Sequence, residues 1–336
     1  MAAGSTLSST GLESFKYQKG CELIYKSGAK PVDSPRAFFS AGQPGSGKSL
    51  SFPPMFRAAA NANFVHIDPD KIRASHPLAY RIFCQYGERE AYRRLRNDVN
   101  SCVGFFIDLM ANLRLNIAIE GTLGHPEVIE KRIAPLRERG YQVSVYVLAT
   151  HARHSVTGMY ERYERQKKLD PKARMASTGS HDKVYLGLLE TLALLESTRQ
   201  VDEIMVFNRA YPIAGCLYEN RMERSGWSRP VGVVEAVLKE RQRPMSNAEK
   251  EYYIEKWVAI ITNMVDRGAA EEKLGRAITV ALKMAYPGDG NDQKEDYFQH
   301  AERIVPDMLA NRSDRSKLTD IFTAGLLTIF NNRPEK

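Results

Sequence analysis

The stretch Gly42 to Ser49, GQPGSGKS, constrains the fold of this chain more than any other feature. It follows the short apolar run 36–41 and precedes residues that can begin a helix. Its glycines, lysine and serine satisfy G-x-x-x-x-G-K-[ST], in which backbone N–H groups turn inward around phosphate oxygens. A helix that starts there adds its positive N-terminus. The sequence therefore predicts a strand, a phosphate-binding loop and a helix, in that order.

This loop indicates that a nucleoside triphosphate binds, and we expect ATP and Mg²⁺ as cofactors. Lys48 would reach the β- and γ-phosphates, and the Ser49 hydroxyl would ligate Mg²⁺. Motors, switches and kinases share such a loop, so it does not define the reaction, and a glycine-rich turn without a ligand is the plainer alternative. The predicted ATP-binding residues are Gly42, Gln43, Pro44, Gly45, Ser46, Gly47, Lys48 and Ser49.

Along the chain, short β-like runs alternate with helical stretches, which is typical of a parallel α/β sheet. After residue 240 the strand pattern stops, and Ser246 with Glu249 has the form of a capping box. We expect a P-loop NTPase-type parallel sheet with flanking helices, plus an all-helical C-terminal extension. The predicted strands are 36–41, 63–67, 116–120, 142–149 and 203–207; helices lie around 88–114, 126–139, 153–168 and 181–199. The predicted segments are 1–35, helical or irregular, 36–240, the kinase domain, and 241–336, the helical extension.

Three acidic side chains are expected at the carboxyl edge of this sheet. Asp68 and Asp70 follow the strand 63–67, and Glu120 ends the strand 116–120. Ligands of open α/β sheets bind at that edge, and a small-molecule kinase needs a carboxylate there to accept the proton of the acceptor hydroxyl. Taken singly, each acid is more often a solvated strand end. Three of them beside a phosphate loop predict a kinase site.

The net charge of +8 is concentrated between Lys131 and Arg174, where eleven Lys or Arg stand against four Asp or Glu. A basic segment favours an anionic partner, although a solvated helix face explains charge alone equally well. Arg162 lies in a helical stretch and Arg174 follows beyond a proline break. This layout is typical of a lid whose arginines neutralise the charge of a transferring phosphoryl group. Ordinary Glu–Arg pairing along an exposed helix is the alternative, and it explains Arg174 poorly.

Composition excludes several other classes of protein. No apolar run approaches the roughly 18 residues of a membrane span. The first residues also lack the basic region and apolar core of a secretory signal. The four cysteines are far apart and form no C-x-x-C, which favours a reduced cytoplasmic chain over a disulfide or zinc protein. We expect a cytoplasmic enzyme with neither a membrane nor a nucleic acid as partner.

Four stretches, in order and spacing, resemble the zeta toxins of bacterial toxin–antitoxin systems. The resemblance covers roughly residues 36–215, and IDxDxxRxxHP together with IEGT is much more specific than the phosphate loop alone. It implies a P-loop kinase, with a separate antitoxin protein that blocks the ATP site. The stretches are GQPGSGKS, IDPDKIRASHP, AIEGTL and RYERQKKLDPKAR.

The resemblance also implies a substrate and residue roles. Zeta toxins move the γ-phosphoryl of ATP to the 3′-hydroxyl of UDP-N-acetylglucosamine, which starves peptidoglycan synthesis. By position, Asp70 would be the base, Lys48 would hold the phosphates and Ser49 the magnesium. Glu120 and Thr122 would contact the sugar nucleotide. Arg162 and Arg174 would stabilise the transferred phosphoryl group. Asp68 would be an outer partner of the metal or a strand-end cap.

One departure leaves the acceptor open. After IEGT many zeta toxins carry a basic residue, whereas this chain continues with Leu123, Gly124 and His125. The same chemistry on a nucleotide, NAD or a polynucleotide end is therefore a close alternative. A nucleotide-dependent ATPase switch with a helical effector domain is an alternative of another class, and it predicts hydrolysis without a phosphorylated product. A binding module that has lost catalysis is disfavoured by the complete set of predicted site residues.

Overall fold

The computed structural model divides the chain into two compact units. Unit 1 comprises Met1–Thr150 and Lys172–Arg241, and unit 2 comprises His151–Pro171 and Gln242–Lys336. The structure describes residues 7–169, 173, 175–209, 215–285, 305–306, 308–311 and 314–331.

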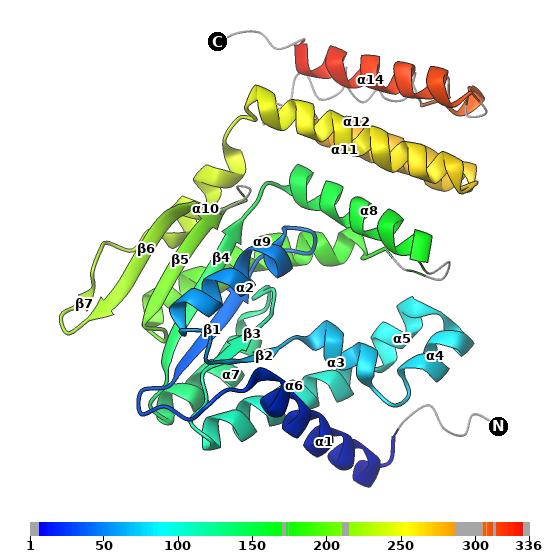
Figure 1. The fold of residues 1–336 in the computed structure, drawn as a ribbon. Coiled ribbons are helices and arrows are strands. Elements are labelled where there is room, and N and C mark those ends of the chain that lie inside the picture. Colours follow the sequence, from blue (N-terminus) through cyan, green and yellow to red (C-terminus); the bar gives the residue numbers. More distant parts are fainter. Residues whose placement is uncertain are drawn as a thin grey trace. The chain divides into compact units, whose positions relative to one another are not determined.

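Unit 1 is built on a seven-stranded sheet in the order β2-β3-β1-β4-β5-β6-β7 (Figure 1). The first five strands are parallel, as predicted, and the hairpin of β6 and β7 is antiparallel and was not expected. β1 lies between β3 and β4, so the strand order reverses at β1, and the carboxyl end of a strand at such a point is where open α/β sheets bind their ligands. The strands are β1 (Arg36–Ala41), β2 (Val65–Ile67), β3 (Ile117–Ile119), β4 (Gln142–Ala149), β5 (Glu203–Asn208), β6 (Cys216–Glu223) and β7 (Gly226–Trp227).

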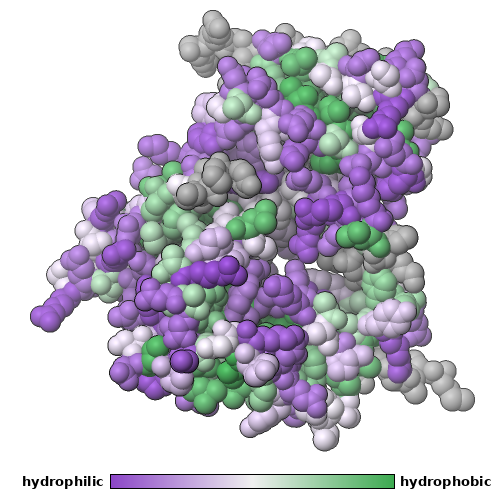
Figure 2. All heavy atoms as spheres, in the orientation of Figure 1, coloured by the Kyte–Doolittle hydropathy of each residue, from purple (hydrophilic) through white to green (hydrophobic). Residues whose placement is uncertain are grey.

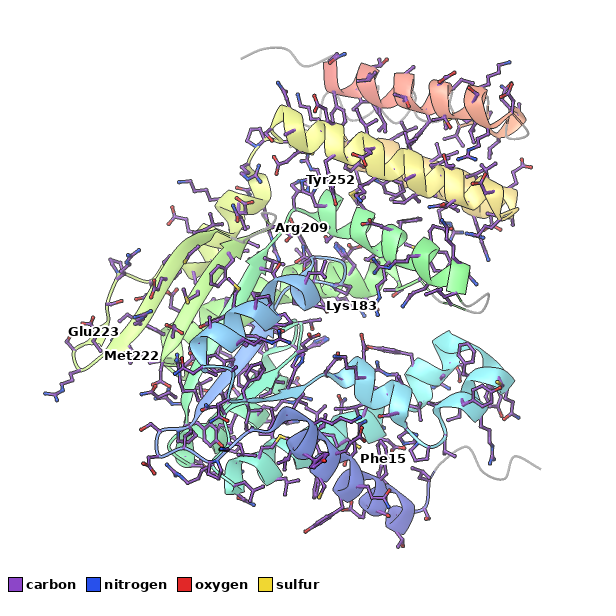
Figure 3. The ribbon with its side chains drawn as sticks, in the orientation of Figure 1. Phe15, Lys183, Arg209, Met222, Glu223 and Tyr252 are labelled. Carbon is purple, nitrogen blue, oxygen red and sulfur yellow. The ribbon has the colours of Figure 1, made fainter. Side chains whose placement is uncertain are left out.

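Helices cover both faces of this sheet, because successive strand residues point to opposite faces and both sets are apolar. Phe38 joins a buried aromatic cluster with Phe52 and Phe56 of α2, whereas Phe39 belongs to the larger core on the other face. Phe15 of α1 packs edge-on against His76, with ring centroids 5.4 Å apart (Figure 3). The helices of unit 1 are α1 (Ser9–Ser27), α2 (Lys48–Ala59), α3 (Pro69–Ser75), α4 (Ala79–Tyr86), α5 (Glu88–Arg94), α6 (Arg96–Asn112), α7 (Pro126–Glu138), α9 (Thr178–Thr198) and α10 (Val233–Gln242).

The β6–β7 hairpin is attached through a buried carboxylate. Glu196, at the end of α9, accepts hydrogen bonds from the Tyr218 hydroxyl (2.5 Å) and the Asn220 amide (3.2 Å) of β6. Its other oxygen accepts from the N–H groups of Gly232 and Val233, both at 3.0 Å. Polar residues of β6 therefore find their partners inside the protein, while Figure 2 shows hydrophilic residues over the free end of the hairpin.

Unit 2 is helical and takes one helix from the middle of the chain. α8 (Ala152–Leu169) packs with α11 (Asn247–Asp266) and α12 (Glu271–Ala285), and α14 (Arg315–Asn331) packs on the latter two. The capping box that starts α11 is confirmed, with both of its hydrogen bonds present. The sequence analysis assigned the α8 segment to the first domain, whereas its contacts group it with the C-terminal helices.

The core of unit 2 forms around two aromatic residues of α11. Trp257 is fully buried and lies 4.9 Å from the ring of Tyr160 on α8. The Tyr253 hydroxyl donates to the Ala281 carbonyl of α12 at 2.7 Å, and burial raises the pKa of that phenol far above its ordinary value. Among the residues that the structure describes, no helix is both long and apolar enough to cross a membrane.

Candidate active site

The phosphate loop between β1 and α2 has the backbone that its glycines allow. Gly42, Gly45 and Gly47 have φ values of 145°, 77° and 103°, where only glycine is free of strain. A Cβ added at Gly42 would lie 3.0 Å from the Ser46 hydroxyl and 3.2 Å from the Leu148 carbonyl. Gly47 caps α2 without a side-chain hydrogen bond, so the first N–H groups of the helix remain available to an anion.

Lys48 lies over this loop and is held by its carbonyl groups. Its ammonium donates to the Gly42 carbonyl at 2.6 Å and to the Gln43 carbonyl at 2.9 Å. The Ser46 N–H donates to the same Gln43 carbonyl at 3.2 Å. The Gln43 peptide therefore fixes the lysine and the turn of the loop together.

Ser49 and Glu120 join the start of α2 to the end of β3. The Ser49 hydroxyl donates to Glu120 Oε2 at 3.3 Å, and His66 Nε2 of β2 lies 3.3 Å from Glu120 Oε1. Burial raises the pKa of Glu120, but His66, the charge of Lys48 and the Ser49 hydroxyl together outweigh it and hold that pKa below its ordinary value. The predicted acid of β3 thus lies beside the phosphate loop.

Asp68 and Asp70 occupy different positions at the start of α3. Asp68 is the N-cap, and its carboxylate accepts from the N–H groups of Asp70 (2.9 Å) and Lys71 (3.3 Å). Asp70 lies in the first turn with 59% of its side chain exposed, and it pairs with Arg73 at 2.5 Å. The guanidinium of Arg73 in turn lies 3.9 Å from the centre of the Tyr92 ring. The capping role weighed for Asp68 is present, and its role toward a metal stays a prediction.

The segment that follows Glu120 is fixed between the phosphate loop and α9. The Thr122 carbonyl accepts from the Gly42 N–H at 3.3 Å, so this predicted substrate residue lies next to the loop. A Cβ at Gly124 would lie 2.9 Å from the Cα of Val184, so only glycine fits against α9 without a shift. The segment with Gly124, where the sequence departs from the expected pattern, is therefore closely packed.

The two predicted lid arginines belong to α8 and to the chain segment that follows it in the sequence. Arg162 is exposed on α8, which belongs to unit 2. Its neighbours bind α8 to α11: Glu161 pairs with Lys256 at 3.0 Å, and Glu164 pairs with Arg267 through two hydrogen bonds of 2.7 Å. Arg174 lies outside the described residues. The roles of both arginines stay predictions.

Sequence reasoning missed several side chains near the predicted site. Arg73 follows Asp70 by three residues on a helix, a spacing that could have predicted the pair. His66 alternates with the buried Val65 and Ile67, so it lies on the other face of β2, yet nothing in the sequence indicated Glu120 as its partner. Arg209, which follows β5, was also missed: its Nε would lie 3.6 Å from a Cβ at Gly47 (Figure 3).

The side chains beside the loop that could bind a magnesium ion present oxygen atoms. The Ser49 hydroxyl and the Glu120 carboxylate face each other, and Mg²⁺ prefers oxygen ligands, with water and substrate phosphates completing its shell. Within the described part of the chain, no group of three or more His, Cys, Asp or Glu side chains could hold a metal ion. The available donor set thus fits a metal bound mainly through a nucleotide.

Comparison with known proteins identifies the family. A sequence model of the zeta toxin family matches residues 23–223. Toxin zeta of Streptococcus pyogenes is 32% identical over 189 residues, or 56% of this chain and 64% of that toxin. Toxin PezT of Streptococcus pneumoniae serotype 4 is 26% identical over 197 residues, or 58% and 75% of the two chains.

A solved structure agrees with this assignment at the level of the fold. It comes from the PezAT chromosomal toxin–antitoxin system of Streptococcus pneumoniae and superimposes with a TM-score of 0.63 at 21% identity, covering 74% of this chain and 93% of that one. The chain spans less than two thirds of the length of the zeta toxins of Streptococcus pyogenes and Enterococcus hirae. Because the family match covers more than half of its residues, the chain belongs to the zeta toxin family.

Proposed function

We propose that this chain is a zeta-type kinase that transfers the γ-phosphoryl group of ATP to the 3′-hydroxyl of UDP-N-acetylglucosamine, and that it acts as a toxin. The observation that carries this proposal is the meeting of Lys48, Ser49 and Glu120 beside the glycine loop, with the Ser49 hydroxyl 3.3 Å from Glu120 Oε2. Phosphoryl transfer depends mainly on positioning and charge stabilisation, and these groups supply both.

The loop and its neighbours divide the binding work. The backbone N–H groups that start α2, with Lys48, bind the phosphates. Ser49 would supply the hydroxyl ligand for Mg²⁺, and Asp68 would be an outer partner of that ion. A magnesium ion in this position would neutralise charge on the phosphates. Glu120 and Thr122 contact the acceptor beside the loop.

Asp70 is the proposed general base. Its carboxylate is exposed, so an acceptor hydroxyl can reach it, and its pairing with Arg73 fixes its orientation. Arg73 is itself held by Tyr92, which limits the movement of the pair. Arg162 and Arg174 would stabilise the transferred phosphoryl group.

A separate antitoxin protein is the proposed partner. One solved structure with this fold comes from a toxin–antitoxin system. The resemblance of the sequence to zeta toxins implies that the partner would cover the ATP site. Such a partner is expected to compete with ATP, so adding ATP should slow its association.

A phosphate-transfer assay tests the proposal. Mg²⁺-ATP labelled at the γ-phosphate is offered with UDP-N-acetylglucosamine, UDP-glucose, NAD or a short oligonucleotide, using wild type and Asp70→Asn. Asp320→Asn, at an exposed position of α14, is the matched control. Label on the amino sugar that disappears only in Asp70→Asn supports both substrate and base.

Other outcomes separate the alternatives. Label on a different acceptor would support a kinase and contradict UDP-N-acetylglucosamine as its substrate. Free phosphate alone, unchanged by Asp70→Asn, contradicts a kinase and favours the ATPase switch.

A further inference from the structure

Arg241, near the end of α10, is a charged side chain buried almost completely in unit 1. Only 2% of the residue is exposed. One of its terminal nitrogens donates to the Tyr185 carbonyl of α9 at 2.7 Å, and its guanidinium lies 3.8 Å from the centre of the Tyr185 ring. Burial lowers the pKa of Arg241 to about 10. A guanidinium in this environment remains charged at neutral pH.

The second terminal nitrogen of Arg241 reaches the phosphate loop. It donates to the side-chain oxygen of Gln43 at 3.4 Å, and Gln43 is itself fully buried. The Gln43 amide also donates to the Thr150 carbonyl, just beyond β4, at 2.6 Å. The Gln43 main-chain carbonyl accepts from Lys48, so Gln43 connects Arg241 to the lysine expected to bind phosphate.

This buried cation has only neutral partners in the described part of the chain. No carboxylate lies within salt-bridge distance of its guanidinium there, and its Nε atom is buried without a hydrogen-bond partner. A buried charge without a counter-charge is costly, and cores usually pair it. The feature that accounts for it here is the adjacent loop, whose glycine backbone and helix N-terminus are built to receive an anion.

We propose that Arg241 is a positioning and charge-balancing residue of the phosphate loop, whose counter-charge is the bound polyphosphate of the nucleotide. It would act through Gln43, which transmits its position to Lys48, and through its field, which is weakly screened in the interior. This inference rests on the proposed function, because it needs a nucleotide in the loop. It adds a residue outside the loop sequence to the determinants of nucleotide affinity.

Nucleotide binding by isothermal titration calorimetry tests the inference, with ATP, ADP, AMP and adenosine as ligands. Arg241→Gln keeps hydrogen-bonding capacity and removes the charge, whereas Arg241→Lys keeps the charge. We expect Arg241→Gln to weaken ATP binding on the order of ten-fold, with smaller losses for ADP and AMP and none for adenosine. Arg241→Lys should recover most of the loss.

The matched control removes the same charge elsewhere in unit 1. Arg137 of α7 pairs with Asp202 at 3.1 Å, and Asp202 lies before β5, at the edge of the sheet opposite the loop. Arg137→Gln should leave ATP affinity within about two-fold of wild type, since this half-buried charge is already balanced by Asp202 and lies at the end of the strands away from the loop. If Arg241→Gln and Arg137→Gln lose ATP affinity equally, the effect comes from net charge alone and the inference is overturned.

Thermal unfolding without nucleotide identifies any loss of folded protein in these variants. Arg241→Gln gives up the hydrogen bond to the Tyr185 carbonyl, so its melting temperature is expected to fall, but a general structural defect would weaken adenosine binding as much as ATP binding. An equal loss for adenosine and ATP would overturn the inference. If Arg241→Gln does not fold, Arg241→Met provides the neutral variant. Equal ATP affinity in the neutral variant and wild type overturns the inference and leaves the proposed function intact; a wild type that binds no nucleotide overturns both.

Discussion

Two buried ionisable side chains, Glu164 in unit 2 and Arg241 in unit 1, have opposite kinds of partner. In unit 2, Glu164 is 1% exposed and is matched by two hydrogen bonds from Arg267 of another helix. In unit 1, Arg241 is as deeply buried but has neutral partners beside a loop suited to anions. The comparison indicates that a paired buried charge fixes helices, whereas an unbalanced one beside a binding loop points to the charge of a ligand. The following changes test this distinction.

The largest expected effect comes from the loop of unit 1. Lys48→Ala should lower the rate of phosphoryl transfer by about 10³, because it removes a preorganised cation from the developing phosphate charge. Thermal unfolding should change little, since the hydrogen bonds of Lys48 to the Gly42 and Gln43 carbonyls lie within the loop. The rate is measured with labelled ATP. Normal turnover in this variant would contradict a role for Lys48 in phosphoryl transfer.

Breaking the paired charge of unit 2 should affect stability instead. Arg267→Gln leaves Glu164 buried without its cation, so we expect the free energy of unfolding of unit 2 to fall by about 3–5 kcal/mol. Urea unfolding followed by tryptophan fluorescence in a Trp227→Phe background reports this unit, because the remaining Trp257 lies in its core. An unchanged unfolding midpoint would show that the pair contributes nothing.

A smaller effect is expected on the pH dependence of activity. His66→Ala removes one of the groups that hold the pKa of Glu120 below its ordinary value, so that pKa should rise. The carboxylate would then be protonated at higher pH, and the acid limb of the activity profile should move upward. The profile is measured between pH 4 and 8. A shift in the opposite direction would contradict the assigned contact.

The smallest effect is expected at the start of α11. The Arg243 guanidinium lowers the pKa of Glu249 to about 2, helped by the Ser246 N–H and hydroxyl and opposed by burial. Because the folded-state pKa is depressed, the stabilisation is present above the unfolded value near 4.5 and is lost as pH falls toward 2. In Glu249→Gln, the free energy of unfolding lost between pH 4.5 and 2 should be smaller than in wild type, by less than about 1 kcal/mol after allowance for solvent screening. Acid unfolding curves that coincide with wild type would contradict it.

The parallel sheet could be predicted because its strands are short apolar runs with turn residues at their ends. The five strands from β1 to β5 lie where the sequence placed them, within two residues at each end. The β6–β7 hairpin was missed because the run ENR, with Glu223 at its end, interrupts the apolar residues of β6. Tyr218 and Asn220 bond to Glu196, which lies more than twenty residues earlier, so no local pattern indicated a strand.

The candidate site was predictable where residues are adjacent in the chain or, like Glu120, end a strand at the carboxyl edge of the sheet. The glycine loop and the Asp68–Asp70 turn follow from local spacing. The contact of His66 with Glu120 and that of Gln43 with Arg241 depend on strand order and on a helix almost two hundred residues away. The placement of α8 was missed for the same reason, since its partners Trp257 and Arg267 follow it by a hundred residues.

The grouping of α8 with the C-terminal helices limits how this chain can be shortened. A gene cut after codon 241 would keep all of the region that matches the family, yet its product would expose the ring of Tyr160 and the carboxylate of Glu164, both buried against α11 and its C-cap. Such a fragment is expected to aggregate or be degraded by proteases at α8. A protein engineer who wants the minimal enzyme must therefore retain the C-terminal helices or redesign the surface of α8.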